Sequence, residues 1–144
     1  MRKSKFWFFC LFFVFLASIY CTAKEEEYFF NKKATLTGTL IVKNFYGPPN
    51  YGETPKQDKI ERHYVLKLDK KIDVISLGDT EGFDIDSEYG VEIIQITFTT
   101  KESIIKSFKN KKIQMTGILF PSINAQQHTP VMIEVKSIKK LGKK

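Results

Sequence analysis

The sequence predicts a mainly β domain. Three observations support this fold class. Apolar and polar residues alternate in five separate segments, as they do in strands with one buried face. One segment with helical spacing lies between the third and fourth of them, and Gly38 stands inside the first, where it permits a sharp bend. This order predicts a five-stranded OB-fold-like barrel with one helix between strands 3 and 4. The alternative is an unspecified five-stranded sandwich or sheet with one helix.

The five predicted strands follow from side-chain alternation. In the first of them, Leu36, Leu40 and Val42 point to the same face. The third is almost continuously apolar, which is typical of a strand buried on both faces. The strands are expected at residues 35–45, 63–69, 91–98, 113–120 and 131–138.

The predicted helix has a start signal, an apolar face and a stop signal. Thr99 is followed three residues later by a glutamate, which is the spacing of a capping box. Ile104, Ile105 and Phe108 share one face, and Asn110 is a suitable last residue.

The first 23 residues have the organisation of a signal peptide. Three basic residues in the first five precede an apolar run at 6–20, and Cys21 and Ala23 occupy the small-residue positions of a cleavage site. We therefore expect an exported protein, periplasmic or secreted. Retention of the leader as a membrane anchor is one alternative. Lipidation after a cut before Cys21 is disfavoured by the bulky Tyr20.

Cleavage would leave an N-terminal extension (24–34), the domain (35–139) and a basic tail (140–144). Both cysteines, Cys10 and Cys21, lie in the leader. The mature chain is therefore expected to contain no disulfide, no thiol nucleophile and no cysteine-ligated metal. Charge divides the mature chain, because residues 24–92 hold ten basic and fourteen acidic side chains and residues 93–144 hold ten and two.

The candidate binding residues lie in two loops. The loop after the first strand, 46–53, is stiffened by two prolines and flanked by glycines, so it can hold its tyrosines outward at small entropic cost. Its candidate residues are Tyr46, Gly47, Pro48, Pro49, Asn50 and Tyr51. The alternative is a rigid crossover with Tyr51 lying back on the barrel end.

The second candidate loop, 124–130, contributes His128, Thr129 and Pro130. In an OB-fold barrel the loops after strands one and four flank one binding face, so Tyr51 and His128 are expected near each other. The alternative is that the two loops brace one another, with His128 bonded to a backbone carbonyl.

The two loops also carry a resemblance. Gly47-Pro48-Pro49-Asn50-Tyr51 and His128-Thr129-Pro130-Val131 resemble a family of small secreted bacterial domains of unknown function, over residues 36–138. In that family a short histidine run precedes the Thr-Pro-Val; this chain has Gln126 and Gln127 there. The resemblance therefore implies a site at the two loops and no particular activity.

Other chemistries find little support in the sequence. His63 and His128 lack a third ligand at a recognisable spacing, and the acidic residues 79–88 do not fit a calcium loop, so no metal and no cofactor are expected. Nucleic acid is an unlikely partner for an exported protein whose second and third strands expose few aromatic residues. No hydrolase or phosphate-binding motif is present.

These observations predict a non-catalytic binding module of the cell envelope that recognises a protein or an anionic polymer through loops 46–53 and 124–130. One alternative is an inhibitor or immunity-type protein of an envelope enzyme. Another is a hydrolase that uses His128. Any membrane contact would come from an uncleaved leader.

The mature chain is predicted to begin at Lys24, because the small residues Cys21 and Ala23 direct cleavage after position 23. Intact-mass spectrometry of the protein from its own cells checks this. A mass that includes residues 1–23, or a lipid on Cys21, would contradict it.

Overall fold

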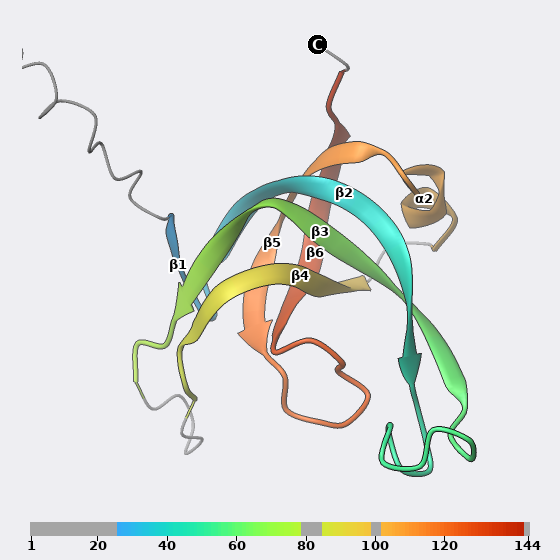
Figure 1. Cartoon of the computed structure of the whole chain (residues 1–144). Helices are drawn as coiled ribbons and strands as arrows, with labels where there is room; N and C mark the ends of the chain where they lie inside the picture. The colour runs from blue at the N-terminus through green and yellow to red at the C-terminus, as the bar shows by residue number, and fades with distance from the viewer. Residues whose placement is uncertain (1–25, 79–84, 99–101, 143–144) are drawn as a thin grey trace, which may run out of the picture.

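The structure, a computed structural model, describes residues 26–78, 85–98 and 102–142. It confirms the mainly β prediction: six strands form one sheet, accompanied by one short helix (Figure 1). The elements are β1 (Glu27–Phe29), β2 (Lys33–Tyr46), β3 (Ile60–Ile75), β4 (Glu88–Phe98), α2 (Glu102–Ser107), β5 (Lys112–Pro121) and β6 (Val131–Lys140). Within these ranges, no helical segment has both the length and the apolar character needed to cross a bilayer.

The predicted count of five strands was wrong, because the expected extension 24–34 contains β1 and the start of β2. β1 pairs in parallel with the end of β3, from Glu27 opposite Asp73 to Phe29 opposite Ile75. Three residues are too few to show a strand period. Phe30, directly after β1, is 5% exposed and belongs to the core, so this short segment is held by tertiary packing.

Several predicted strand bounds also moved outward: β3 begins at Ile60 instead of residue 63, and β4 begins at Glu88 instead of residue 91. β3 continues six residues past position 69, because Ile72 and Val74 return to the core after the charged residues 69–71. β6 includes Lys140, which was expected to begin the basic tail.

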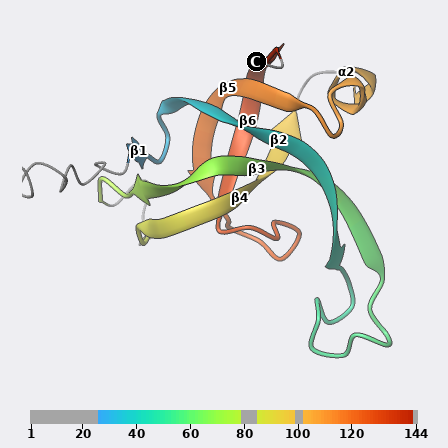
Figure 2. The ribbon, with the colours of Figure 1, turned by 45° about the horizontal axis from the view of Figure 1, so that its top comes forward.

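The hydrogen-bonded neighbours of the five longer strands follow a closed path. β2 pairs with β3 and with β5, β5 pairs with β6, β6 pairs with β4, and β4 pairs again with β3. The β4–β6 contact is parallel, and the other four contacts are antiparallel. Figure 2 shows β2 and β3 running side by side across the molecule.

Gly38 is the residue at which β2 changes partners. It pairs with Leu68 of β3 and with Ile113 of β5. A Cβ atom built there would lie 2.2 Å from the carbonyl oxygen of Lys67, closer than any real contact. At Gly38, where the sequence predicted a bend, the β3 backbone therefore lies too close for a side chain to fit.

The core consists of apolar side chains that are shielded from solvent. Side chains with 0% exposure come from every long strand and include Leu40, Leu66, Ile94, Ile113, Met115, Leu119 and Ile133. α2 adds Ile105, which is 1% exposed. Burying such a side chain stabilises the fold by about 1.5–3 kcal/mol, which explains how so short a helix is held.

The helix ends near the predicted stop. Asn110 has a positive φ of 59°, as expected for a residue that terminates a helix, and its N–H donates to the carbonyl of Leu40. The regular helix ends earlier than predicted, at Ser107, and the chain reaches Asn110 through a turn. The predicted cap Thr99 lies outside the described residues.

Gly38→Ala is predicted to lower the free energy of unfolding by about 1–3 kcal/mol, because the added methyl overlaps the backbone of β3. Gly142→Ala is the control, since a Cβ there meets nothing within 4 Å. Urea unfolding of both variants measures the difference. Equal stability of the two would show that β3 can move away from Gly38 at no cost.

Candidate functional site

The loop between β2 and β3 is closed at its base by backbone hydrogen bonds. The N–H of Gly47 donates to the carbonyl of Lys59 over 2.7 Å, and the N–H of Lys59 donates to that of Pro48 over 3.0 Å. The N–H of Tyr51 donates to the Gly47 carbonyl over 3.0 Å, and the Pro48–Pro49 peptide bond is cis. The predicted turn is thus an ordered structure.

Asp58 anchors the tip of this loop, a role the sequence analysis missed. Its carboxylate accepts from the N–H of Asn50 over 2.8 Å and from that of Gly52 over 2.7 Å. These charge-assisted bonds satisfy two amides that the turn leaves free. An aspartate a few residues after a Pro-Asn-x-Gly turn is the signal that could have indicated it.

Both tyrosines of this loop reach solvent. Tyr46 is 44% exposed and Tyr51 is 38% exposed, with a positive φ of 51°. The Tyr46 ring lies beside Gly52, 3.5 Å from the position of an added Cβ.

The loop between β5 and β6 is held by side-chain bonds. Oε1 of Gln127 accepts from the N–H groups of Ile123 and Asn124. Thr129 is 2% exposed; its hydroxyl accepts from the Gln95 N–H and donates to the carbonyl of Val131. Thr129 is therefore a structural residue of the loop, whereas its neighbour Pro130 is exposed.

His128 belongs to a cluster with Glu61 and His63 of β3. Nε2 of His128 donates to Oε2 of Glu61 over 3.1 Å, and Nε2 of His63 lies 3.4 Å from the same oxygen. The His128 ring stacks on Phe45, with centroids 4.7 Å apart and planes at 7°. The hydrogen bond from His128 lowers the pKa of the Glu61 carboxyl below its ordinary value.

Gln95 of β4 connects this cluster to the loop behind it. Its Oε1 accepts from the backbone N–H of His128 over 2.7 Å. Its Nε2 donates to the carbonyl of Gln126 and to Nδ1 of His63, both over 3.3 Å. Because Nδ1 of His63 accepts this bond, the proton of the neutral ring is on Nε2, facing Glu61.

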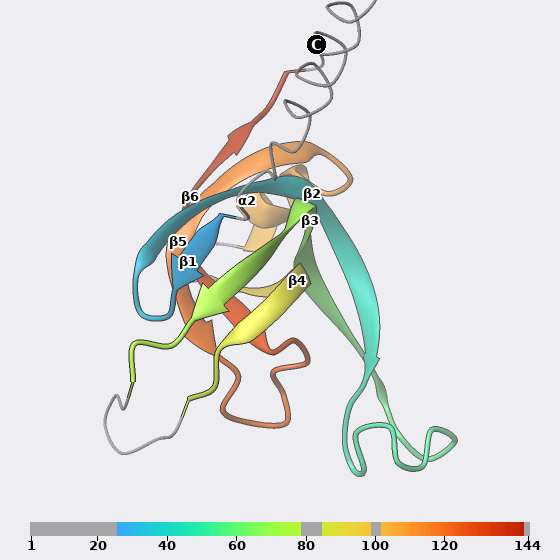
Figure 3. The ribbon, with the colours of Figure 1, turned by 60° about the vertical axis from the view of Figure 1, so that its left-hand side comes forward.

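The two candidate loops project from the same end of the molecule (Figure 3). Glu61 of β3 lies between the two loops, because it bonds to His128 of the second loop and packs against Gly47 of the first. Gly47 touches Glu61 so closely that an added Cβ would lie 2.6 Å from Cγ and Cδ. The side chain of His128 is only 8% exposed, whereas those of Glu61 and His63 are about one-third exposed.

The sequence analysis missed Glu61 and His63 as site residues, and it expected no cluster with metal-ligand character. The strand was predicted to begin at residue 63, so Glu61 fell outside it; in the structure the two residues are two positions apart on β3 and therefore share a face. The register of β2 against β3 places them opposite Phe45 and Lys43. The third member, His128, follows 65 residues after His63. A local sequence pattern cannot show that residues so far apart in the chain meet.

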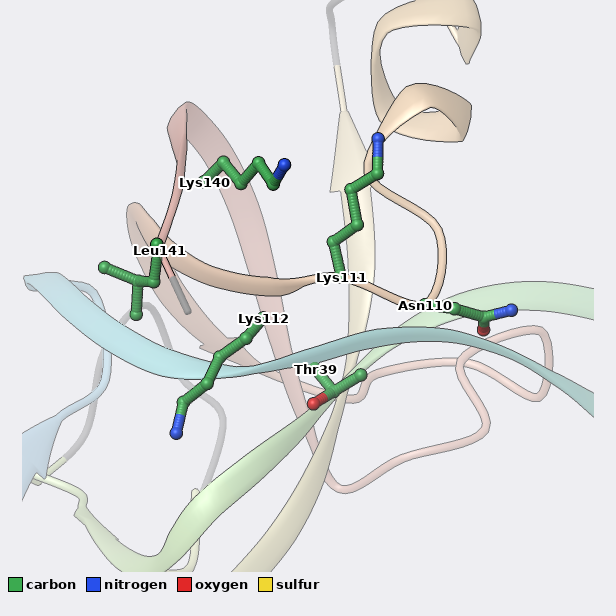
Figure 4. A pocket seen from close by; sticks show the side chains of 7 residues that line it. Thr39, Asn110, Lys111, Lys112, Lys140 and Leu141 are labelled. Carbon is green, nitrogen blue, oxygen red and sulfur yellow. The ribbon is translucent and has the colours of Figure 1, made fainter. Parts of the chain in front are cut away.

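A second feature lies where β5 begins and β6 ends, away from the two loops. It is an open concavity of about 940 Å³, lined by Thr39, Asn110, Lys111, Lys112, Lys140, Leu141 and Gly142. Figure 4 shows Lys111 and Lys140 reaching toward one space, whereas Lys112 points the other way. Lys112 forms an ion pair with Asp69 over 3.2 Å.

Gln95→Leu is predicted to lower the free energy of unfolding by about 1–3 kcal/mol, because it leaves the backbone groups of His128 and Gln126 without their partner. The matched control is Gln114→Leu, at a partly exposed position of β5. Chemical denaturation measures both. Equal effects would show that water replaces the Gln95 bonds.

A family described as a domain of unknown function (DUF4431) matches residues 93–139, which begin within β4 and end within β6. No curated protein and no solved structure was found to match the chain. The resemblance to a family of unknown function is thereby supported for the last third of the chain. Residues 128–131 lie inside the matched part, whereas the Gly47–Tyr51 stretch precedes it.

Proposed function

We propose that this protein is an exported, non-catalytic binding module that recognises a protein of the cell envelope through loops 46–53 and 124–130. The observation that carries the proposal is the location of exposed apolar side chains. Seven large ones are exposed in the described part of the chain, and four lie on or beside these loops: Tyr46, Tyr51, Ile60 and Ile123. Exposed aromatic and aliphatic side chains gathered on ordered loops are typical of protein recognition sites.

The loops are suited to this role because they are already ordered. The bonds of Asp58 and Gln127 hold each loop in one conformation, so little entropy is lost when a partner binds. Beside the second loop is a hollow of about 430 Å³ that could receive a partner side chain. It is lined by Ile85, Asp86, Glu88, Pro121, Ser122, Ile123 and Pro130.

We further propose that the strands form an OB-fold-like barrel and that residues 1–23 direct export. The closed path of strand pairings and the position of α2 between β4 and β5 support the barrel. The basic start and the apolar run of the leader support export.

Catalysis by His128 is the weaker alternative. Its Nε2 bonds to Glu61, one ring face is covered by Phe45, and its side chain is 8% exposed. A general base needs a free ring nitrogen within reach of the substrate. An inhibitor or immunity-type protein would use the same loops as a wedge, so it is a special case of the binding proposal.

An anionic polymer is the second candidate partner, favoured by the lysine-lined concavity. Lys111 and Lys140 both line it, although they are far apart in the sequence, and the ammonium of Lys111 donates to the carbonyl of Ser107. Lysine ammonium groups gathered on one surface attract phosphate or carboxylate groups.

Combining Tyr46→Ser with Tyr51→Asn is predicted to weaken capture of an envelope protein at least about tenfold per tyrosine, because interface aromatics dominate binding energy. Asparagine tolerates the positive φ of Tyr51, so the turn is kept. The control is Tyr89→Ser, which removes a tyrosine that is 71% exposed on β4. Pull-down from envelope extract with quantitative mass spectrometry measures capture.

Equal capture by the double variant and the control would refute recognition by the tyrosines. A different result would place the binding site at the lysine-lined concavity: binding is unchanged by the tyrosine substitutions, weakens with added salt and is lost in Lys140→Gln.

A further inference from the structure

We propose that Glu61, His63 and His128 form a binding site for one divalent transition-metal ion of the zinc type. One ligand atom from each residue lies within 4.8 Å of the other two. Oε2 of Glu61 is 3.1 Å from Nε2 of His128 and 3.4 Å from Nε2 of His63. With metal–ligand bonds of about 2.0–2.1 Å, neighbouring ligands of a tetrahedral site stand about 3.3 Å apart. Oε2 of Glu61 already stands at nearly this separation from both imidazole nitrogens.

The donor set selects the class of metal. Two imidazoles and one carboxylate suit Zn²⁺ and its neighbours in the first transition row, whereas Ca²⁺ and Mg²⁺ prefer oxygen ligands. Three protein ligands leave a fourth position open. Glu61 and His63 are about one-third exposed, so that position can face solvent or a side chain of a partner.

The ligands are held by their surroundings. The Phe45 ring packs flat on His128, and Gly47 leaves room for Glu61. Such outer contacts orient metal ligands and raise affinity. The bound ion would also join the loop before β6 to β3.

Metal binding requires one local rearrangement. Without metal, each imidazole directs its Nε2–H group at Glu61. A metal ion bound to Nε2 replaces that proton, and the proton of the neutral ring is then on Nδ1. For His63 that proton would face Nε2 of Gln95, 3.3 Å away, so the Gln95 amide must turn. The side-chain amide resonances of Gln95 should therefore shift when the metal binds, which is a readout specific to this site.

The experiment is calorimetric titration with Zn²⁺ of the chelator-treated protein, purified without a histidine tag. Cys10→Ser and Cys21→Ser are included if the leader is retained, because thiols bind zinc. We expect one ion per chain, and visible absorption of a four-coordinate complex when Co²⁺ replaces Zn²⁺. Glu61→Gln and His63→Gln should each weaken binding at least about tenfold.

Glu53→Gln, the same change on the neighbouring loop, is the matched control and should bind as the parent protein does. Glu61→Gln keeps the size of the side chain, so it tests the site even if His63→Gln fails to fold; circular dichroism checks each variant. Absence of binding, or equal binding by Glu61→Gln and Glu53→Gln, would overturn the proposal. The inference does not depend on recognition by the loops, because Zn²⁺ titration needs no partner protein.

Discussion

The structure depends on the ability of β2 to pair with two strands at once. Its first half hydrogen-bonds to β5 and its second half to β3, and the two pairings overlap at Gly38 and Thr39. The absence of a side chain at Gly38 lets the β3 backbone approach there. Because of this overlap, the closed path of strands is completed while the far end of β2 remains free to extend beyond the core. Phe45 and Tyr46 are its last residues, and the loop between β2 and β3 follows it (Figure 1).

The polar cluster arises from the same arrangement. The register of β2 on β3 sets Phe45 opposite Glu61, and β4 lies on the other side of β3, where Gln95 can reach both His63 and the backbone of His128. A buried amide in such a position stabilises the fold only when its bonding groups are satisfied, and here both ends of the Gln95 side chain are used. Gln95 consequently ties the loop before β6 to the sheet through Gln126, His128 and Thr129, and the ring of His128 completes the cluster. Residues from strands thus determine the geometry of a site that the loops alone could not hold so firmly.

The antiparallel pairing of β5 with β6 organises the positive charge. It sets Ile113 opposite Lys140, so lysines at the start of one strand and the end of the other gather around one concavity. Four of the seven exposed large hydrophobic side chains of the described residues, Tyr46, Tyr51, Ile60 and Ile123, lie on or beside the two loops instead. The protein therefore presents two surfaces of different chemistry, one basic and one apolar beside a Glu–His–His cluster, separated by the length of the strands.

The strand-rich fold class, the five long strands, the place of the helix and the two loops could be predicted from the sequence, which also marked Gly38 as a special position in its strand. Each of these depends on local signals: alternation, spacing, and the conformational preferences of glycine and proline. The tertiary structure alone decided the pairing of β1, the continuation of β3 past its charged residues, the anchoring role of Asp58 and the meeting of Glu61 and His63 with His128. β1 is too short to have a detectable period, and β3 is interrupted by residues 69–71 that only its neighbours show to be part of a strand. The cluster depends on which strands become neighbours and in what register, and that information is spread over the whole core and is absent from any local stretch of sequence.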